Sequence, residues 1–312
     1  MAKFLVTGGA GFIGSHIVDA LVRDGNKVRV LDDFSSGKRE NLAAVFGKIE
    51  LLEGDIRDVA KVNKAVSGVD YILHQAGLRS VPKSMLKPHA YNEVNISGTL
   101  NILQAAKEAE VKRLVFASSS SIYGETDKFP EKEDAYPLLV SPYALTKLAG
   151  EYYCRIFSLM WNLEAVSLRY FNVFGPRQSL ENEYAVVIPK FITCMLKDEQ
   201  PPIHGDGKQT RDFTYVDNVV QANLKAATAK GVSGEVFNVA CGKANSVLDI
   251  VSVVNKILKK SVKPKFTPFR PGDVKNTLAD ISKAKKLLKF EPMVGFEEGL
   301  KKTVEYFKKA IT

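Results

Sequence analysis

The first half of the chain alternates short apolar runs with amphipathic stretches. β-Branched apolar runs of strand length stand at residues 3–8, 27–33, 49–55, 70–77, 113–119 and 164–171. Apolar residues with helical spacing separate them, as in residues 12–25, where Gly25 ends the predicted helix, and in residues 96–110. Strands that alternate with helices in this order predict an α/β protein, a doubly wound parallel sheet with helices on both faces.

The pattern changes beyond about residue 172, where prolines and glycines become more frequent and the predicted elements become shorter. Residues 235–240, "EVFNVA", still have the pattern of a buried strand, so we expect the chain to return to the sheet there. We therefore expect a larger domain over residues 1–171, to which residues 211–240 return. A smaller, discontinuous domain is expected over residues 172–210 and 241–312.

Composition and charge are those of an ordinary globular protein. Hydrophobic residues make up 45% and charged residues 25% of the 312 residues, which argues against a disordered chain. The net charge of +9 comes mainly from lysines in the C-terminal part, which suit solvated helix faces and also a polyanionic small substrate. No basic block with interleaved aromatic residues occurs, so no nucleic-acid partner is expected.

The three cysteines, Cys154, Cys194 and Cys241, are an odd number without metal-ligand spacing. We expect neither a metal site nor a disulfide framework, and a reducing, cytoplasmic location. The first residues begin a strand rather than a signal peptide, and no apolar run approaches the roughly 20 residues of a membrane span. No membrane partner is therefore expected.

A glycine-rich turn, "TGGAGFIGSH", joins the first predicted strand to the first predicted helix. Gly8, Gly11 and Gly14 stand three apart, and Gly9, Gly11 and Gly14 also fit the pattern G-x-G-x-x-G. Glycine allows positive φ and a close approach of the backbone to a pyrophosphate, and the free N–H groups of a helix start attract anions. The glycines by themselves fit a structural turn equally well.

A carboxylate strengthens the dinucleotide interpretation. Asp32 ends the second predicted strand, 18 residues after Gly14, where it can accept both ribose hydroxyls of adenosine. It would repel a 2′-phosphate, which favours NAD over NADP, although Lys38 and Arg39 lie nearby. Asp55 ends the third strand and either faces the adenine or caps the next helix.

Candidate catalytic residues follow the sheet. Ser141 and Pro142 predict a helix start, which places Tyr143 and Lys147 four apart on one helix face. An ammonium beside a phenol lowers the pKa of the phenol, so Tyr143 can take a proton from a substrate hydroxyl near neutral pH. With 11 tyrosines, about one such pair is expected by chance, and packing is the alternative role.

A run of serines follows the predicted strand at 113–119. Ser119 and Ser121, in "FASSSSIYG", stand where open α/β sheets bind ligands, and either hydroxyl can hydrogen-bond a reacting oxygen. Without Tyr143, a serine-rich turn would be the simpler interpretation.

Together these motifs resemble the extended short-chain dehydrogenase/reductase family, which has a Rossmann fold. The resemblance rests on the three glycines, Asp32, "HQAG", Asn95 in "NISGTL", "SSSSIYG", Tyr143-x-x-x-Lys147 and "RYFNVFGP". The motifs "GDGKQTRDFTYVDN", "NSVLDIV" and "RPGDVKNTLADISKA" extend it nearly to the C-terminus. Within the family the sequence looks like an NAD-dependent nucleotide-sugar 4-epimerase, most similar to UDP-N-acetylglucosamine 4-epimerases.

The resemblance implies a mechanism with NAD bound throughout. Tyr143 removes the proton of the sugar 4-hydroxyl, carbon 4 gives a hydride to the nicotinamide, and the keto sugar turns and takes the hydride back on its other face. Ser119 would shuttle the proton with help from Ser121, and Lys147 would hold the nicotinamide ribose and polarise Tyr143. The implied cofactor-binding residues are Gly8, Gly11, Phe12, Ile13, Gly14, Asp32, Asp33, Ser36, Gly37, Asp55, Ile56, Gln75, Ala76, Gly77, Asn95, Tyr143, Lys147, Tyr170 and Val173.

The resemblance also implies a UDP-sugar site in the smaller, substrate domain. The implied residues are Arg79, Ser80, Ser119, Tyr143, Asn172, Val187, Ile188, Lys190, Arg211, Arg270, Asp273 and Thr277. Arg211 and Arg270 would bind the diphosphate beside Asn172, Asp273 would face the uridine ribose, and Val187 and Ile188 would bracket the uracil.

Within this resemblance, the choice of sugar depends on the residue at position 277. Thr277 stands where glucose-restricted relatives carry a large aromatic residue, so its small side chain would leave room for an acetamido group. The alternative is a threonine chosen for local packing. His204 stands where an aromatic or amide residue is expected beside the uracil.

Three other functions are compatible with a fold of this class. A 4,6-dehydratase needs an acid and a base where this chain has Ser120 and Ser121, so that chemistry is not expected. A UDP-glucuronate 4-epimerase stays open, because Arg79 can meet a carboxylate. A non-catalytic, dinucleotide-sensing regulator would tolerate the loss of Tyr143, which is present.

Assembly is also implied by the resemblance. Helices predicted around residues 84–109 and 141–161 have apolar positions beyond one core-facing stripe. The family pattern implies a homodimer through a four-helix bundle there, and deeper burial within a monomer is the alternative.

Overall fold

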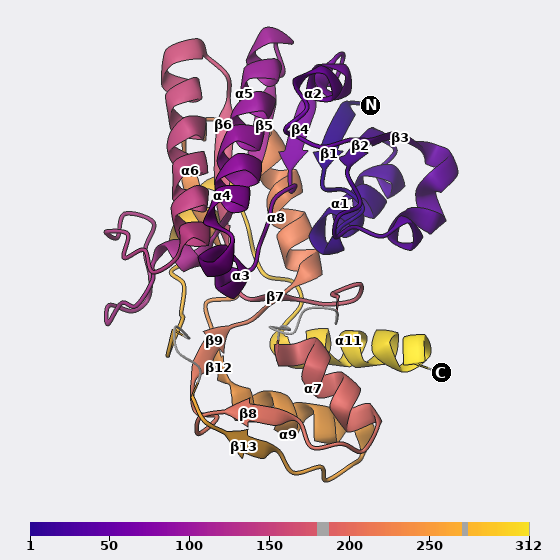
Figure 1. Ribbon diagram of the computed structural model, residues 1–312, viewed down its shortest axis with the longest axis vertical. Coiled ribbons are helices and arrows are strands. Elements are labelled where there is room, and N and C mark those ends of the chain that lie inside the picture. The colour runs from indigo at the N-terminus through magenta and orange to yellow at the C-terminus, as the bar shows by residue number, and fades with distance from the viewer. Residues whose placement is uncertain (180–186, 270–273, 312) are drawn as a thin grey trace.

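A seven-stranded, all-parallel sheet forms the centre of the molecule, with the order β11-β6-β5-β4-β1-β2-β3 (Figure 1). The computed structural model describes residues 1–179, 187–269 and 274–311. The strands of this sheet are β1 (Lys3–Thr7), β2 (Lys27–Asp32), β3 (Ile49–Glu53), β4 (Tyr71–His74), β5 (Arg113–Ser119), β6 (Ala165–Tyr170) and β11 (Val236–Val239). The predicted doubly wound parallel sheet is confirmed.

The strand order changes direction at β1. The chain runs from β1 outward through β2 to β3, and then returns to pair β4 on the other side of β1. The connections that leave β1 and β4 therefore diverge at the carboxyl edge of the sheet. A crevice at such a switch point is where open α/β sheets bind ligands.

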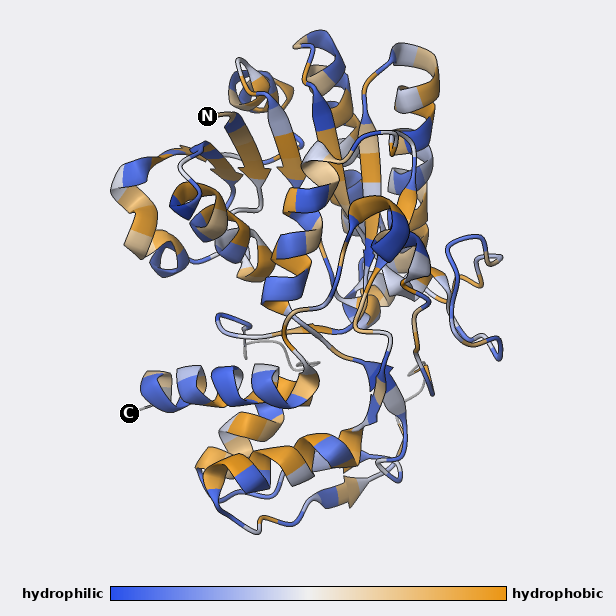
Figure 2. Ribbon diagram, turned by 180° about the vertical axis from the view of Figure 1, so that it is seen from behind, coloured by the Kyte–Doolittle hydropathy of each residue, from blue (hydrophilic) through white to orange (hydrophobic). Residues whose placement is uncertain are grey.

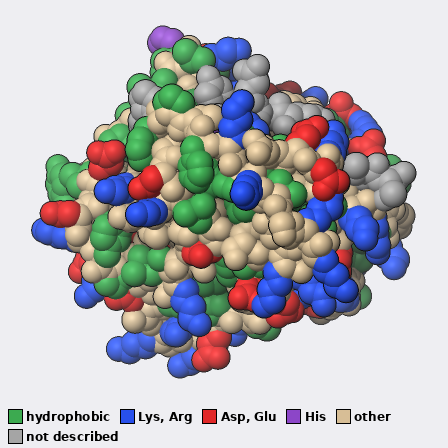
Figure 3. Space-filling model, turned by 90° about the horizontal axis from the view of Figure 1, so that it is seen from below, with side chains coloured by type: hydrophobic (Ala, Val, Ile, Leu, Met, Phe, Trp, Pro, Cys, Tyr) green, Lys and Arg blue, Asp and Glu red, His purple; other side chains and the backbone are tan. Residues whose placement is uncertain are grey.

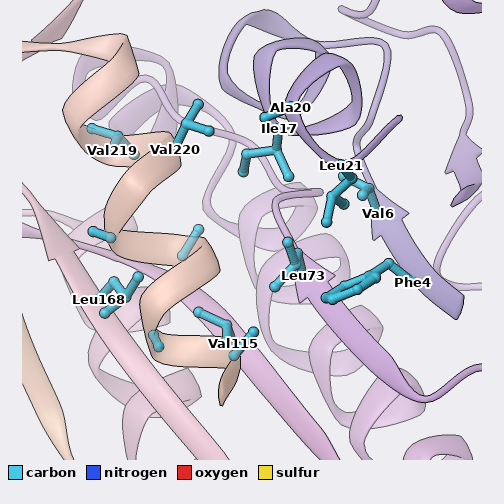
Figure 4. Close-up of a cluster of buried hydrophobic side chains, with 14 of the residues drawn as sticks. Phe4, Val6, Ile17, Ala20, Leu21, Leu73, Val115, Leu168, Val219 and Val220 are labelled. Atoms are coloured by element: carbon cyan, nitrogen blue, oxygen red, sulfur yellow. The ribbon is translucent and has the colours of Figure 1, made fainter. Parts of the chain in front are cut away.

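Helices cover both faces of the sheet. One face carries α1 (Phe12–Arg23), α8 (Val216–Thr228) and α10 (Ser282–Leu288), and the other carries α2 (Val59–Val66), α5 (Thr99–Glu108) and α6 (Pro142–Trp161). On the first face Ile17 of α1 and Val219 of α8 pack with Val6, Leu73 and Leu168 of the strands (Figure 4). These strands are apolar over much of their length, as Figure 2 shows, because both of their sides are covered.

Short elements join these layers. They are the 3₁₀ segments η1 (Arg39–Lys48) and η3 (Ser120–Ile122), the helices α3 (Val81–Leu86) and α4 (Pro88–Tyr91), and the π-helical turn η2 (Asn92–Gly98). The helix predicted around residues 84–109 is therefore divided among α3, α4, η2 and α5.

The smaller part lies below the carboxyl edge of the sheet in Figure 1. Its helices are α7 (Val187–Leu196), α9 (Val247–Leu258) and α11 (Phe296–Ile311). Its strand pairs are β7 (Val173–Phe174) with β10 (Thr214–Tyr215), β8 (Pro202–His204) with β13 (Lys265–Thr267), and β9 (Thr210–Asp212) with β12 (Ala244–Ser246). Phe174, Ile188, Phe191, Ile250 and Phe307 belong to a separate hydrophobic core in this part.

The surface of this lower end mixes charges of both signs. Lysine and arginine side chains are interspersed with acidic ones in the view from below (Figure 3). This distribution fits solvated helix faces. Within the described ranges, no helix is both long and apolar enough to cross a membrane.

Candidate active site

The glycine turn after β1 is packed too closely for side chains. Gly8 has φ +66°, and a Cβ atom there would lie 2.7 Å from the backbone nitrogen of Ala76. A Cβ atom on Gly14 would lie 2.1 Å from the carbonyl oxygen of Gly8. The absence of side chains therefore brings the start of α1 directly against the turn, and the turn against the segment after β4.

The start of α1 suits an anion. Gly11 is its N-cap, and no side chain in the described part of the chain caps the free N–H groups of the first turn. Asp32 holds the turn in place, because its carboxylate accepts hydrogen bonds from the N–H groups of Ala10 at 2.8 Å and Phe34 at 2.9 Å. Burial raises the pKa of Asp32 above its usual value. Its remaining lone pairs can still accept ribose hydroxyls.

A cavity of about 420 Å³ opens at the switch point, within the usual size of a small-molecule site. Most of the predicted cofactor-binding residues line it. They are Gly8, Gly11, Phe12, Ile13, Gly14, Asp32, Asp33, Ser36, Asp55, Ile56, Gln75, Ala76, Gly77, Tyr143, Lys147 and Tyr170.

Three predicted cofactor-binding residues do not line this cavity. Asn95 accepts a hydrogen bond from the N–H of Leu78 at 2.8 Å and donates one to its carbonyl at 2.9 Å, so it holds the loop after β4. Gly37 backs Asp32, since a Cβ there would lie 2.8 Å from the carboxylate. Val173 packs against the hydrophobic cores.

Neighbouring charges are already paired. Arg39 forms an ion pair with Glu53 and lies over the ring of Phe34, so its charge is engaged at the edge of the sheet. Asp55 is paired with Arg57, Nη2 to Oδ2, at 2.6 Å. The alternative that Asp55 caps a helix is excluded, because Asp58 caps α2.

Several residues that no sequence motif predicts shape the cavity wall. Asn223 of α8 stands behind the wall, where it is fully buried and hydrogen-bonds the Tyr170 hydroxyl and the Gln75 amide, which fixes both. Ser118 lines the cavity itself. Six others come from distant segments, namely Arg177, Gln178, Ser179, Tyr306, Phe307 and Ala310. No local motif marks these positions, because only the packing of the smaller part against α1 brings them there.

The catalytic candidates meet at the end of β5. The hydroxyl of Ser141 caps α6, and Tyr143 and Lys147 are buried on the face of α6 toward the sheet. The hydroxyl of Tyr143 is hydrogen-bonded to the side chain of Ser119. The ammonium of Lys147 donates to the carbonyl of Ala117 at 2.8 Å. The spacing seen in the sequence therefore produces one constellation at the cavity.

The pKa of the Tyr143 phenol is shifted in the direction opposite to the one expected from the sequence. Burial raises the pKa of Tyr143, and the opposing influences are its hydrogen bond with Ser119 and the charge of Arg79. The ammonium of Lys147 lies 6.0 Å from the centre of the tyrosine ring. The expected lowering of this pKa by Lys147 is not found: Lys147 is not among the groups that shift the pKa of Tyr143, and desolvation outweighs the influences of Ser119 and Arg79. Burial also lowers the pKa of Lys147 to about 8.

The serines differ in their contacts. Ser119 accepts a hydrogen bond from the N–H of Ser121 at 3.2 Å and caps η3. The hydroxyl oxygen of Ser121 is buried and has no hydrogen-bond partner among the described residues. Ser119 is therefore the serine in contact with Tyr143.

The predicted substrate residues are distributed unevenly. Arg79 lines the cavity, and its charge acts on Tyr143. Ser80 caps α3 by accepting from the N–H of Lys83, so its hydroxyl is engaged by the helix. Arg211 donates from Nη1 to the carbonyls of Thr210 and Lys275. Arg270 and Asp273 lie outside the described residues.

Thr277 is buried between Asn172, which follows β6, and Asp212 of β9. Its hydroxyl accepts hydrogen bonds from the Asn172 amide at 3.0 Å and from the N–H of Asp212 at 3.2 Å. The residue therefore orients Asn172, besides being small.

The uracil prediction needs correction at α7. The side chain of Ile188 is fully buried with Phe191 and Ile192, because the apolar face of α7 forms the core there. It cannot bracket a ligand. Val187 is half-buried against the same core, and Lys190 is half-buried on the next turn.

Comparison with known proteins agrees with this geometry. A model of the NAD dependent epimerase/dehydratase family matches residues 4–240. The chain belongs to this family and is an NAD-dependent enzyme of that class.

Three solved structures are similar over 99% of the chain. The UDP-N-acetylglucosamine 4-epimerase of Methanobrevibacter ruminantium M1, in complex with UDP-N-acetylmuramic acid, is 42% identical, with a TM-score of 0.95 and 99% of its chain covered. The UDP-glucose 4-epimerase of Thermotoga maritima, with UDP-glucose, is 39% identical, with a TM-score of 0.94 over its whole length. The UDP-glucuronic acid 4-epimerase of Bacillus cereus, with UDP-glucuronic acid and NAD, is 36% identical, with a TM-score of 0.91 and 99% covered. The three act on different sugars.

Proposed function

We propose that the protein is a UDP-sugar 4-epimerase that retains NAD and interconverts UDP-N-acetylglucosamine with UDP-N-acetylgalactosamine, and also UDP-glucose with UDP-galactose. The proposal depends mainly on one observation: Ser119 is hydrogen-bonded to Tyr143, which lines a cavity that fits a dinucleotide. The likeness to three 4-epimerases supports the reaction.

The residues of the cavity fit NAD. The glycine turn leaves space where a Cβ would intrude, and Asp32 stands at the end of β2 for the adenosine ribose. Tyr143 and Lys147 line the same cavity. When bound, the coenzyme supplies the hydride acceptor and donor that inversion at carbon 4 requires.

Tyr143 and Ser119 move the proton. Tyr143 accepts the proton of the 4-hydroxyl in its phenolate form, which burial disfavours and which the Ser119 hydrogen bond and the Arg79 charge favour. Ser119, already hydrogen-bonded to Tyr143, positions and relays that proton. Lys147 keeps a fixed orientation through the Ala117 carbonyl, with its ammonium 6.0 Å from the centre of the Tyr143 ring. Because the site is buried, these hydrogen bonds act with little competition from water.

Thr277 supports the acetylated substrates. Its side chain is small and lies beside Asn172, so the wall there leaves more volume than a tyrosine would. A 4-epimerase of UDP-glucuronate is the second candidate, because the Arg79 charge reaches Tyr143 and can meet a carboxylate on the neighbouring carbon. The assembled Tyr143, Ser119 and Lys147 do not favour a non-catalytic regulator.

The test is incubation of the purified protein with UDP-N-acetylglucosamine without added NAD, followed by chromatographic separation of the isomers. UDP-glucose and UDP-glucuronate are run in parallel. The proposal predicts formation of the 4-epimer of the acetylated sugar. Turnover of UDP-glucuronate alone would favour the second candidate, and no turnover of any sugar, even with NAD added, would contradict an epimerase.

We also propose a homodimer through α5 and α6. The outward side of α6 exposes Leu145, Tyr152, Ile156, Leu159 and Met160, with Leu159 exposed to 72%. These positions follow helical spacing along one face, and a contiguous apolar face of this kind is typical of an interface.

A further inference from the structure

A buried ion pair lies directly behind the catalytic candidates. Glu151 follows Lys147 by one turn of α6, and Arg169 belongs to β6. Their side chains are 4% and 5% exposed. The Glu151 carboxylate accepts from Arg169 Nε at 2.9 Å and from Nη2 at 2.8 Å, one bond on each oxygen. The geometry is bidentate, which is the strongest arrangement for this pair.

The remaining hydrogen-bonding groups of the pair are also used. Arg169 donates its third nitrogen, Nη1, to the carbonyl of Glu133 at 3.3 Å, and its guanidinium lies 4.8 Å from the centre of the Tyr123 ring. Glu151 accepts one further hydrogen bond, from the Ser118 hydroxyl, at 2.5 Å. The pair is therefore fixed on every side, as a buried ion pair must be to avoid a large desolvation cost.

This arrangement ties α6 to three consecutive residues of β5. Lys147 is bonded to the carbonyl of Ala117, Glu151 to the hydroxyl of Ser118, and Tyr143 to the side chain of Ser119. Tyr143, Lys147 and Glu151 are spaced four apart, so they share one helix face. The hydrogen bond between Glu151 and Ser118 therefore fixes β5 at the residue that directly precedes Ser119.

The pair also determines which charges surround Lys147. The titratable groups on its own helix face are Tyr143 and Glu151, β6 contributes Arg169, and β4 contributes His74. Burial lowers the pKa of His74 to about 3, so this ring is neutral. Because Arg169 occupies both oxygens of Glu151, the pair is neutral as a unit and gives Lys147 no counter-ion. In agreement, burial is what lowers the pKa of Lys147.

We propose that Glu151 and Arg169 form a positioning unit of the active site. Through Ser118 the unit holds Ser119 in register with Tyr143, and its internal neutrality leaves the buried Lys147 without a counter-ion. Neither residue touches the reacting atoms. The inference rests on the roles proposed for Tyr143 and Lys147 and holds for whichever UDP-sugar the enzyme turns over.

Opposite single substitutions test the charge balance. Glu151→Gln leaves Arg169 as a lone cation, which favours the neutral form of Lys147. In a plot of kcat against pH, the decline at high pH is then expected to shift to lower pH by about one unit. Arg169→Met leaves Glu151 as a lone anion and shifts that decline to higher pH by about the same amount. The double variant has no charge and returns near the wild-type profile. A purely structural pair would lower activity without shifts of opposite sign.

Two substitutions of Ser118 test whether its hydrogen bond to Glu151 holds Ser119 in place beside Tyr143. Ser118→Ala removes only the hydroxyl that Glu151 accepts, and Ser118→Thr restores it. The alanine variant is expected to lose about tenfold in kcat with KM, melting temperature and bound-coenzyme content near wild type, and the threonine variant to recover. Because Ser118 lines the cavity, coenzyme content is measured spectroscopically in each sample. This comparison and Glu151→Gln remain informative where Arg169→Met does not fold.

The outcomes distinguish a failure of the positioning unit from a failure of the proposed epimerase activity. Unshifted profiles in Glu151→Gln and Arg169→Met, or wild-type kcat in Ser118→Ala, overturn the positioning unit while leaving the epimerase intact. A Lys147→Met variant whose decline in kcat at high pH equals that of wild type contradicts the role proposed for Lys147 itself. The positioning unit then falls with it.

Discussion

The side-chain amide of Asn172 donates a hydrogen bond of 3.0 Å to the hydroxyl of Thr277. The same hydroxyl accepts from the backbone of Asp212, so Thr277 connects the segment after β6 with β9. Thr277 thus combines two properties, a small volume and a hydroxyl with two partners. Substitutions can separate them.

Thr277→Tyr is expected to abolish turnover of UDP-N-acetylglucosamine while UDP-glucose is still epimerised, because the larger ring fills the volume proposed for the acetamido group. The measurement is kcat/KM for both sugars. Thr277→Ser, which keeps the hydroxyl and the small volume, is the matched control. Full activity of the tyrosine variant on the acetylated sugar would contradict the proposed selection.

Tyr143→Phe removes the proton acceptor with little change in shape. We expect a fall in kcat of about 10²-fold or more, since general acid–base groups contribute about that much. KM and coenzyme content should stay near wild type, because the ring remains. A variant with wild-type turnover would show that another group accepts the proton.

Gly14→Ala tests the contact between α1 and the glycine turn. A Cβ atom at this position would lie 2.1 Å from the carbonyl oxygen of Gly8, so α1 must move away from the turn. The purified variant should contain little bound NAD and should melt at a lower temperature. Gly47→Ala, where a Cβ meets no atom of the described residues within 4 Å, is the control. Equal coenzyme content in both variants would argue against the close packing.

Glu131 links pH to stability. It is 2% exposed, its Oε2 accepts from the N–H of Leu278 at 3.0 Å, and Oε1 has no hydrogen-bond partner among the described residues. Burial raises its pKa to about 7 from a usual value of 4.5, so the folded state binds more protons than the unfolded state between these values. The free energy of unfolding therefore falls as pH rises through this window, by about 3 kcal/mol for this group.

Glu131→Gln should remove that fall. The variant is expected to melt at a higher temperature than wild type at pH 8 and at a similar temperature at pH 4, measured by calorimetry. Glu125→Gln, an exposed position in the same loop, is the control. A variant less stable than wild type at pH 8 would show that the ionised carboxylate stabilises the fold.

Leu159→Glu should convert the proposed homodimer into a monomer, because the exposed apolar side of α6 would then bring carboxylates together across the interface. Light scattering after size-exclusion chromatography measures the mass. Met293→Glu, exposed to 64% outside α6, should leave the dimer intact. A wild-type protein that is monomeric at all concentrations would refute the interface.

The sequence predicted which candidate catalytic residues lie together better than it predicted the cavity wall. Tyr143, Lys147 and Ser119 lie in local motifs whose helix and strand contexts are readable, and the structure brings them together. Arg177 and Tyr306 also line the cavity, and nothing in their local sequence shows it. The resemblance predicts that Ile188 contacts the ligand, whereas the apolar periodicity of α7 places its side chain in a core.

The sequence by itself determined the parallel sheet, the glycine turn and the Tyr143–Lys147 pair, because each depends on periodicity or on spacing within one element. The tertiary structure decided the protonation of Tyr143, the pairing of Glu151 with Arg169 and the contact between Asn172 and Thr277. These features depend on burial and on side chains from distant segments. Desolvation and long-range contacts exist only after the chain has packed, so no local pattern encodes them.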